Sequence, residues 1–280
     1  MNKISAFSSQ KKLLMLALDH RGSFEKLLKT GNIAGNENQI ITIKRLLIES
    51  LNRLYSGILL DSKFGLPAYQ EAAERNSGIL AKPYLLAIEK SGYRKENGGR
   101  VTELEYSVEF LKKQGAKGVK ILLYFHPQAA TAGLQLRLTK KLLEECRQNS
   151  LPLFLEILTY PLNSHGFDLA ASIIDSVTVF LENDIKPDVF KLEYPGNPEA
   201  CQSITDLLSG TPWILLTKGV DFQTFKIFLR NAVTHGASGF LAGRSLWQDF
   251  IDRPQDKWPE FFSITVKERF QEITEIVTTG

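Results

Sequence analysis

Short apolar runs alternate with longer amphipathic segments along almost the whole chain. Most of the runs are four to eight residues long, and all are rich in Leu, Ile, Val or Phe. Such runs are typical of strands that are buried on both faces of a parallel sheet. The pattern predicts eight strands, at residues 13–19, 57–61, 79–89, 119–125, 153–158, 189–194, 213–217 and 238–243.

The segments between these runs have the spacing of amphipathic helices. In residues 39–55, for example, Ile40, Ile43, Leu47 and Leu51 recur at steps of three and four residues, which places them on one helix face. Similar spacing predicts further helices at residues 103–115, 135–149, 168–183, 199–210 and 222–236, and a terminal helix at 258–277.

Eight strands with helices between them favour a closed barrel over an open, doubly wound sheet. The sequence therefore predicts an α/β protein with a single (β/α)8 TIM barrel, formed by one domain over residues 1–280. We expect the segment 258–277 to pack outside the barrel. The polar, Gly-containing stretch 92–100 is interpreted as a loop and not as a domain boundary.

Composition narrows the class of partner. The formal net charge of +3 is small and the basic residues are scattered, so neither a nucleic acid nor a membrane is an expected partner, although a modest local excess of positive charge could attract an anionic metabolite.

Residues 1–10 do not resemble a signal peptide, and no apolar stretch is long enough for a spanning helix. We therefore expect a cytoplasmic protein, with homo-oligomer formation left open. Cys146 and Cys201 match no zinc or disulfide pattern.

Charged residues interrupt three of the apolar strand runs. The fourth predicted strand has Lys120, the fifth has Glu156, and the sixth has Lys191 followed by Glu193, whereas Asp19 ends the first strand and Asp61 the second. A buried charge is costly unless it is paired or used in chemistry. Two-residue alternation groups Val189 with Lys191 on one strand face. If these faces line the lumen, Glu156 lies between the two lysines.

This set of residues suits amine chemistry. A buried lysine beside a second ammonium loses its proton more readily than a free lysine does, and the neutral amine can attack a ketone to form a Schiff base. A nearby carboxylate can then move the protons that carbon–carbon cleavage requires. The same residues could instead form only a buried ion-pair network, and the pattern alone leaves that alternative open.

The last two strands end in possible anion-binding segments. Thr217, Lys218 and Gly219 follow the seventh strand, and Gly243 and Arg244 follow the eighth. Loops at these places in a barrel often bind phosphate through backbone N–H groups, and a guanidinium fits phosphate oxygens. The alternative is a glycine turn beside a surface arginine.

The histidines do not indicate a metal site. His20, His126, His165 and His235 show no close pair with ligand spacing. His20 and His126 follow the first and fourth predicted strands, so each could contact a substrate. We predict no metal ion and no cofactor.

The chain resembles the class I tagatose-1,6-bisphosphate aldolases and the related sulfofructose-phosphate aldolases over most of its length. The matching segments, specific in their order and spacing, are residues 15–27, 59–68, 85–93, 119–125, 153–160, 190–195, 213–225 and 237–247. Glu89 and Lys90 are the same residue types as in this family, but the resemblance assigns them no role.

The resemblance implies a metal-independent lyase in which Lys191 forms the Schiff base with a phosphorylated ketose. It implies that Glu156 and Lys120 act beside Lys191 and that Asp19 lies near the substrate. It also implies that Gly219, Gly243 and Arg244 bind phosphate. We expect His20, Arg21, Thr217 and Lys218 among the residues that contact substrate or phosphate.

Some positions depart from the family pattern. His20 stands where the family usually has Gln, and Thr217 and Lys218 stand where it usually has Ser and a small residue. These changes surround the ends of the substrate, so the identity of the ketose stays open. Alternatives are a sulfofructose-phosphate or deoxy-sugar phosphate aldolase, and a non-catalytic phosphosugar-binding protein. The lack of clustered histidines disfavours a zinc-dependent aldolase.

Overall fold

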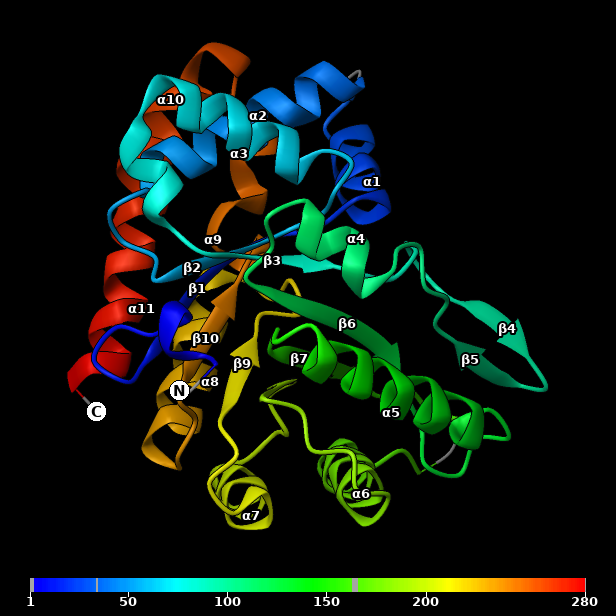
Figure 1. The fold of residues 1–280 in the computed structure, drawn as a ribbon. Helices are drawn as coiled ribbons and strands as arrows, with labels where there is room; N and C mark the ends of the chain where they lie inside the picture. The colour runs from blue at the N-terminus through cyan, green and yellow to red at the C-terminus, as the bar shows by residue number, and fades with distance from the viewer. Residues whose placement is uncertain (1–2, 34, 163–165, 280) are drawn as a thin grey trace.

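Eight parallel strands close into a barrel, with helices around its outside (Figure 1). The computed structural model describes residues 3–33, 35–162 and 166–279. The strands of the barrel are β1 (Leu13–Leu18), β2 (Gly57–Leu60), β3 (Tyr84–Ala87), β6 (Gly118–Tyr124), β7 (Leu153–Leu158), β8 (Val189–Leu192), β9 (Trp213–Leu216) and β10 (Gly239–Ala242). The predicted (β/α)8 barrel is confirmed.

The order of strands around the barrel is β1, β10, β9, β8, β7, β6, β3 and β2. Three strands therefore separate β10 from β6 in either direction, so these two strands face each other across the lumen. Strand β8 lies midway between them on one side, and β2 lies midway on the other.

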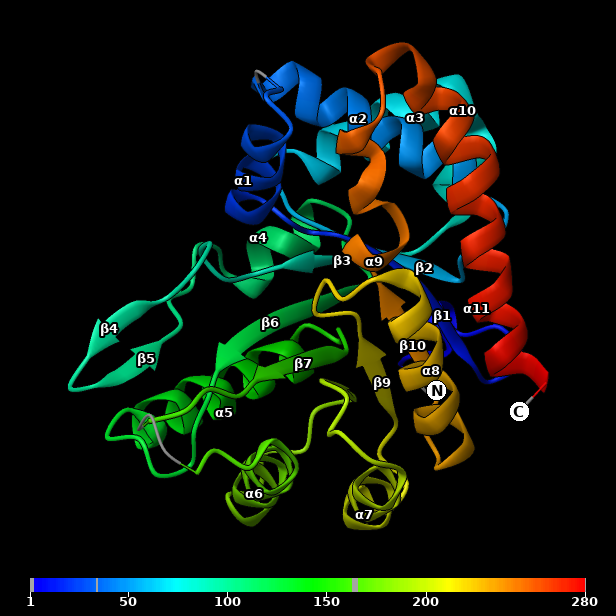
Figure 2. The same ribbon diagram turned by 180° about the vertical axis from the view of Figure 1, so that it is seen from behind.

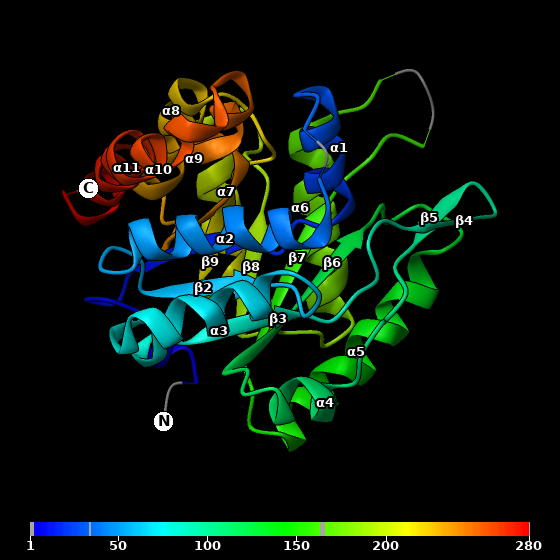
Figure 3. The same ribbon diagram turned by 90° about the horizontal axis from the view of Figure 1, so that it is seen from above.

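Helices follow or precede the strands in the expected alternation. They are α1 (Gly22–Thr30), α2 (Glu37–Leu51), α3 (Gly65–Arg75), α4 (Val108–Lys113), α5 (Ala132–Gln148), α6 (Leu169–Glu182), α7 (Pro198–Leu208), α8 (Phe222–Thr234), α9 (Arg244–Trp247), α10 (Trp258–Phe261) and α11 (Lys267–Thr279). Asn36, Asp168, Asn197 and Asp221 cap the N-termini of α2, α6, α7 and α8, because their side-chain oxygens accept backbone N–H groups that the first helical turn leaves unpaired. Figure 3 shows α2 and α3 side by side next to β2 and β3.

Two predicted elements are shorter in the structure. The third strand begins at Tyr84, because a 3-10 helix occupies Ser77–Ala81. The predicted helix 103–115 begins only at Val108, where Ser107 provides the N-cap. Before this helix, Leu104 forms a β-bridge with Glu89. Helices α1 and α3 were not predicted.

The segment 92–100, interpreted as a loop, contains most of a β-hairpin. Strands β4 (Arg94–Glu96) and β5 (Gly99–Val101) pair antiparallel outside the barrel. Asn97 and Gly98 form the turn between them, and both have positive φ angles, of 47° and 76°, as a two-residue type I′ hairpin turn requires. Figure 1 shows the hairpin projecting on the side to which the arrowhead of β6 points.

The core has two parts. One lies between the barrel and its helices, and the other fills the lower lumen with apolar side chains, among them Met15, Phe154 and Val189. Phe7, which precedes β1, closes the lower end and packs edge-on against Phe154 at 5.6 Å between ring centroids. The apolar floor leaves only the carboxyl ends of the strands for polar chemistry.

The C-terminal segment packs outside the barrel, where α11 lies along α8 (Figure 2). The predicted helix 258–277 is interrupted by a π-helical turn at Phe262–Val266. Cys146 and Cys201 are buried free thiols. Within the described residues, none of the helices combines the length and the apolar character needed to cross a membrane.

Candidate active site

A polar layer lies directly above the apolar floor of the lumen. Phe154 and Val189 belong to the floor, and Glu156 and Lys191 follow two residues later on the same strand faces. Glu156 and Lys191 are register partners on β7 and β8. The Oε2 atom of Glu156 lies 2.9 Å from Nζ of Lys191 and 2.9 Å from Nζ of Lys120. The predicted position of Glu156 between the two lysines is confirmed.

Lys120 is held by three carboxylates. Besides Glu156, its Nζ donates hydrogen bonds to Oδ2 of Asp19 at 2.8 Å and to Oε1 of Glu89 at 2.7 Å. Burial alone would lower the pKa of Lys120, but the carboxylates of Asp19, Glu156 and Glu89 outweigh burial and raise its pKa well above the usual value. Lys120 is therefore a fixed ammonium ion beside Lys191.

Asp19 carries the complementary charge. Burial acts to raise the pKa of Asp19, but Lys120 and Lys191 hold that pKa far below its ordinary value. Its carboxylate is thus ionised at neutral pH, at the carboxyl end of β1. Among described carboxylates, Glu156 alone lies within ion-pair distance of Lys191, whereas three surround Lys120.

Sequence reasoning assigned no role to Glu89, although this residue is buried in the polar layer. It follows β3 by two positions and shares a strand face with Ala87, which belongs to the lumen floor. The predicted third strand, residues 79–89, ends at Glu89, and the same two-residue alternation that grouped Val189 with Lys191 also groups Ala87 with Glu89.

His20 lies beside this layer as a neutral imidazole. Burial lowers the pKa of His20 to about 3, an effect that nearby Asp19 opposes and the positive charge of Arg244 reinforces. The ring packs edge-on against Trp247 at 5.5 Å between centroids. A Cβ atom on Gly243 would lie 2.7 Å from Cε1 of His20, so this close approach requires glycine.

Arg21 points away from the phosphate segments. Its guanidinium forms an ion pair with Glu105 and donates a hydrogen bond to the backbone carbonyl of Glu89 at 2.5 Å. These contacts connect the end of β1 to the segment that follows β3. Contact between Arg21 and substrate stays a prediction.

The two predicted phosphate segments meet at one small cavity of about 70 Å³. Its lining includes residues from both segments together with the nucleophile candidate: Ala17, His20, Glu156, Leu158, Lys191, Leu216, Thr217, Lys218, Leu241, Gly243 and Arg244. The Nε atom of Arg244 is buried and has no hydrogen-bond partner among the described residues. An unpaired, buried guanidinium donor in a cavity suits an anionic ligand.

Backbone conformation adapts the loop after β9 to this arrangement. Gly219 has a φ angle of 78°, and a Cβ atom there would lie 3.2 Å from Cζ of Arg244. Lys218 has a φ angle of 50°, which is uncommon for a residue with a side chain. Its Nζ forms an ion pair with buried Glu193, so its charge is already partly neutralised by the protein.

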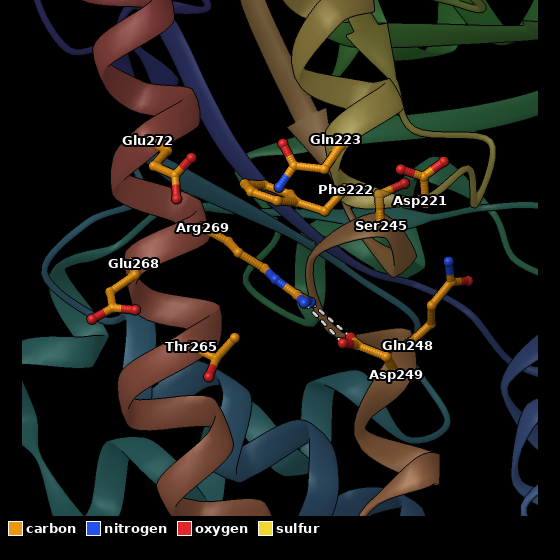
Figure 4. A pocket seen from close by; sticks show the side chains of 10 residues that line it. All are labelled: Asp221, Phe222, Gln223, Ser245, Gln248, Asp249, Thr265, Glu268, Arg269 and Glu272. Carbon is orange, nitrogen blue, oxygen red and sulfur yellow. Dashed lines mark hydrogen bonds and ion pairs between the residues drawn. The ribbon is translucent and has the colours of Figure 1, made fainter.

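A second layer of contacts braces this loop from outside the lumen. Ser245 donates a hydrogen bond to the carbonyl of Val220, and Gln248 donates one to the carbonyl of Gly219 at 3.0 Å. Figure 4 shows Ser245 and Gln248 at the edge of an outer pocket in which Arg269 forms a bidentate pair with Asp249. Sequence reasoning did not identify these bracing residues.

A separate buried ion pair fixes the ends of β1 and β2. Nζ of Lys44 contacts Oδ2 of Asp61 at 2.5 Å and donates hydrogen bonds to the carbonyls of Leu18 and His20 at 2.7 and 2.9 Å. Asp61 accepts the backbone N–H groups of residues 63–65. Lys44 follows Ile40 by four residues and precedes Leu47 by three, so helical spacing places it on the apolar face of α2, a signal that the sequence analysis did not use.

The described histidines do not converge. His20 follows β1 and His126 follows β6, whereas His235 caps the end of α8 and contacts the carbonyl of Asn231 through Nδ1 at 2.8 Å. His126 lines a different pocket from His20. His165 lies outside the described residues.

Comparisons with known proteins agree with this architecture. The model of the family described as DeoC/LacD family aldolase matches residues 13–249. A tagatose 1,6-diphosphate aldolase of Staphylococcus aureus (strain Newman) is 30% identical over 301 residues, which cover 94% of this chain and 90% of that protein.

Solved structures show the same fold. A Schiff-base-forming fructose-1,6-bisphosphate aldolase superposes with a TM-score of 0.68 at 16% identity, covering 99% of this chain and 98% of that one. The fructose-bisphosphate aldolase of Slackia heliotrinireducens gives a TM-score of 0.67 at 15% identity, covering 99% and 89%. With the family model matching most of its length, the chain belongs to the DeoC/LacD family of aldolases and is a carbon–carbon lyase.

Proposed function

We propose that the protein cleaves a phosphorylated ketose through a Schiff base on Lys191. The observation that carries this proposal is the placement of Lys191, a buried lysine that lines the cavity of Arg244 and lies 2.9 Å from Glu156. An amine, a proton-transferring carboxylate and an anion-binding guanidinium are thus gathered at the carboxyl ends of the strands, where barrel enzymes bind substrate.

The chemistry follows from these positions. The neutral amine of Lys191 attacks the ketone carbon, and Glu156 protonates the departing hydroxyl group, so that water leaves and an iminium ion forms. The bond between C3 and C4 then breaks as a carboxylate takes the proton of the C4 hydroxyl group. The electron pair moves into the iminium to give an enamine, and an aldehyde departs. Protonation of the enamine and hydrolysis release the second product.

The two lysines have different roles in this scheme. Lys120, surrounded by three carboxylates, stays charged and positions Glu156. Asp19 lies where it can contact the hydroxyl groups of the substrate.

The favoured substrate is tagatose 1,6-bisphosphate, cleaved to dihydroxyacetone phosphate and a three-carbon aldehyde phosphate. The Staphylococcus aureus relative that carries this activity in its name supports the choice. Thr217, Lys218, Gly219, Gly243 and Arg244 are then the residues that bind the phosphate next to the ketone. A cytoplasmic location and a homo-oligomeric state stay predictions.

A turnover assay tests the proposal. The enzyme is mixed with tagatose 1,6-bisphosphate, and the release of triose phosphate is followed with and without a chelator. We expect turnover that the chelator does not change and that Lys191→Met reduces to background while ligand binding persists. Binding without turnover by the unaltered enzyme would instead identify a non-catalytic phosphosugar-binding protein.

A further inference from the structure

The hairpin β4–β5 carries two positive charges that the described residues do not neutralise. Lys95 and Arg100 are direct register partners across the hairpin, so their side chains lie on the same face. Neither forms an ion pair with a described carboxylate, although the hairpin does contain Glu96. Like charges placed directly opposite each other destabilise a strand pair, unless an anion lies between or beside them.

The carboxylates near the hairpin are already paired on its other face. Glu96 forms an ion pair with Arg94 at 2.5 Å, and Glu103 lies 3.3 Å from Arg94 and 3.8 Å from Lys90. Arg94 is opposite Val101 in the register. One face of the hairpin is therefore balanced in charge, whereas the face with Lys95 and Arg100 is not.

Three aromatic rings pack around the guanidinium of Arg100, and its side chain donates no hydrogen bond to a described residue. Its Cζ atom lies 4.3 Å from the ring centroid of Tyr160, 4.6 Å from that of Tyr93 and 5.5 Å from that of Tyr124. Its backbone N–H donates to the hydroxyl of Tyr160 at 3.1 Å. Cation–π contacts favour the positive charge, but they do not occupy the N–H groups that could bind an oxyanion.

Space for a ligand is present on this face. Lys95, Arg100 and Tyr160 line a groove of about 400 Å³ between the hairpin and the segment after β7. Glu96 also lines this groove, but its carboxylate is paired with Arg94. Tyr124 ends β6 and follows Lys120 by four residues, so two-residue alternation places both on the same strand face. Through its contact with the Tyr124 ring, Arg100 is thus connected to the strand that carries Lys120.

The barrel places this groove opposite the cavity of Arg244. Arg244 follows β10, Tyr124 ends β6, and these strands face each other across the lumen with β8 midway between them. A linear ketose with one phosphate at Arg244 and its carbonyl carbon at Lys191 would extend toward β6. Arg21 is already paired with Glu105, whereas Lys95 and Arg100 have no ion-pair partner among the described residues.

We propose that Lys95 and Arg100 bind a second anionic group of the substrate, a terminal phosphate or sulfonate on the aldehyde-forming half. This site rests on the proposed function, because its position is defined by a ketose attached to Lys191. It makes the hairpin a specificity element of the enzyme, which selects ketose phosphates that are charged at both ends.

The experiment compares kcat/KM for tagatose 1,6-bisphosphate and for tagatose 1-phosphate, which lacks the distal charge. The ratio of interest is kcat/KM for the bisphosphate divided by kcat/KM for the monophosphate. Arg100→Gln and Lys95→Gln should each lower this ratio by about tenfold or more, since each removes a charge-assisted hydrogen bond that only the bisphosphate can accept. Because both substrates are measured on the same preparation, the fraction of folded enzyme cancels. Arg94→Gln, on the balanced face, is the matched control and should leave the ratio unchanged.

Three results would overturn the inference: equal kcat/KM values for the two ketoses in the unaltered enzyme, equal losses for both in Arg100→Gln, or no loss at all. In each case Arg100 serves only to hold the hairpin. The 6-sulfonate analogue of fructose 1-phosphate, measured in parallel, shows which oxyanion the site prefers. Failure of the proposed function is distinct, since neither ketose would then form an adduct with Lys191.

Discussion

Two buried lysine–carboxylate groups lie near the carboxyl ends of the barrel strands, and they differ in whether their contacts are complete. At Lys44, one ammonium ion meets Asp61 and two carbonyls, and Asp61 in turn accepts three backbone N–H groups. Nζ of Lys191 instead contacts Glu156 in the wall of a cavity that also contains Arg244, whose buried Nε has no partner among the described residues.

This difference distinguishes an ion pair that stabilises the fold from one that can take part in catalysis. A group whose donors and acceptors are all satisfied has nothing left to offer a ligand, so the pair of Lys44 and Asp61 stabilises the fold. A group that is incompletely satisfied and borders a cavity can exchange partners with a substrate. Burial of charge alone therefore does not identify the active site, whereas burial together with unused donors does.

The largest effect that this comparison predicts is on catalysis. Glu156→Gln keeps the shape of the side chain but cannot transfer protons, so kcat should fall by about 10²- to 10⁴-fold. Steady-state kinetics provide the measurement, and chemical unfolding should show a smaller loss of stability than any variant of Lys44. A kcat within a few-fold of the unaltered enzyme would assign Glu156 to structure.

The next effect is on stability. Lys44→Met leaves Asp61 buried without its cation, and breaking a buried pair in this way costs about 3–5 kcal/mol in the free energy of unfolding. Denaturant titration measures this loss, and the double variant Lys44→Met/Asp61→Asn should recover part of it. If Lys44→Met were as stable as the unaltered protein but inactive, the two lysine groups could not be separated as we describe.

The smallest effect at neutral pH concerns the pH dependence of stability. The pKa of His20 is lowered to about 3 in the folded chain, so between pH 6.5 and 3 the unfolded state binds a proton that the folded state does not. Stability then falls as the pH falls through this window, by at most about 1.4 kcal/mol per pH unit. His20→Gln should flatten the profile there, and parallel profiles for the two proteins would contradict the buried neutral imidazole.

The barrel could be predicted from sequence because each strand is a short apolar run bounded by polar residues. Strand 153–158 was predicted with the bounds that the structure has. The helix after β2 was missed, because Gly65 and Pro67 at its start are typical of turns. The hairpin was missed since its strands are polar, with Arg94, Lys95 and Glu96 in β4.

The candidate site was predicted in part for the same reason. Lys120, Glu156 and Lys191 stand out as charges within apolar runs, and the alternation of strand residues places them on the lumen face. The sequence analysis did not identify Glu89 or Lys44. Glu89 follows its strand instead of interrupting it, and Lys44 is a helical residue whose partners come from β1 and β2.

The central claim is that Lys191, and not Lys120, forms the covalent bond to substrate. Borohydride reduction of the enzyme during turnover of tagatose 1,6-bisphosphate, followed by peptide mass spectrometry, tests it most directly. We predict one reduced adduct, on the peptide that contains Lys191, and none in Lys191→Met. An adduct on Lys120, or an unmodified Lys191 in an enzyme that turns over substrate, would contradict the account.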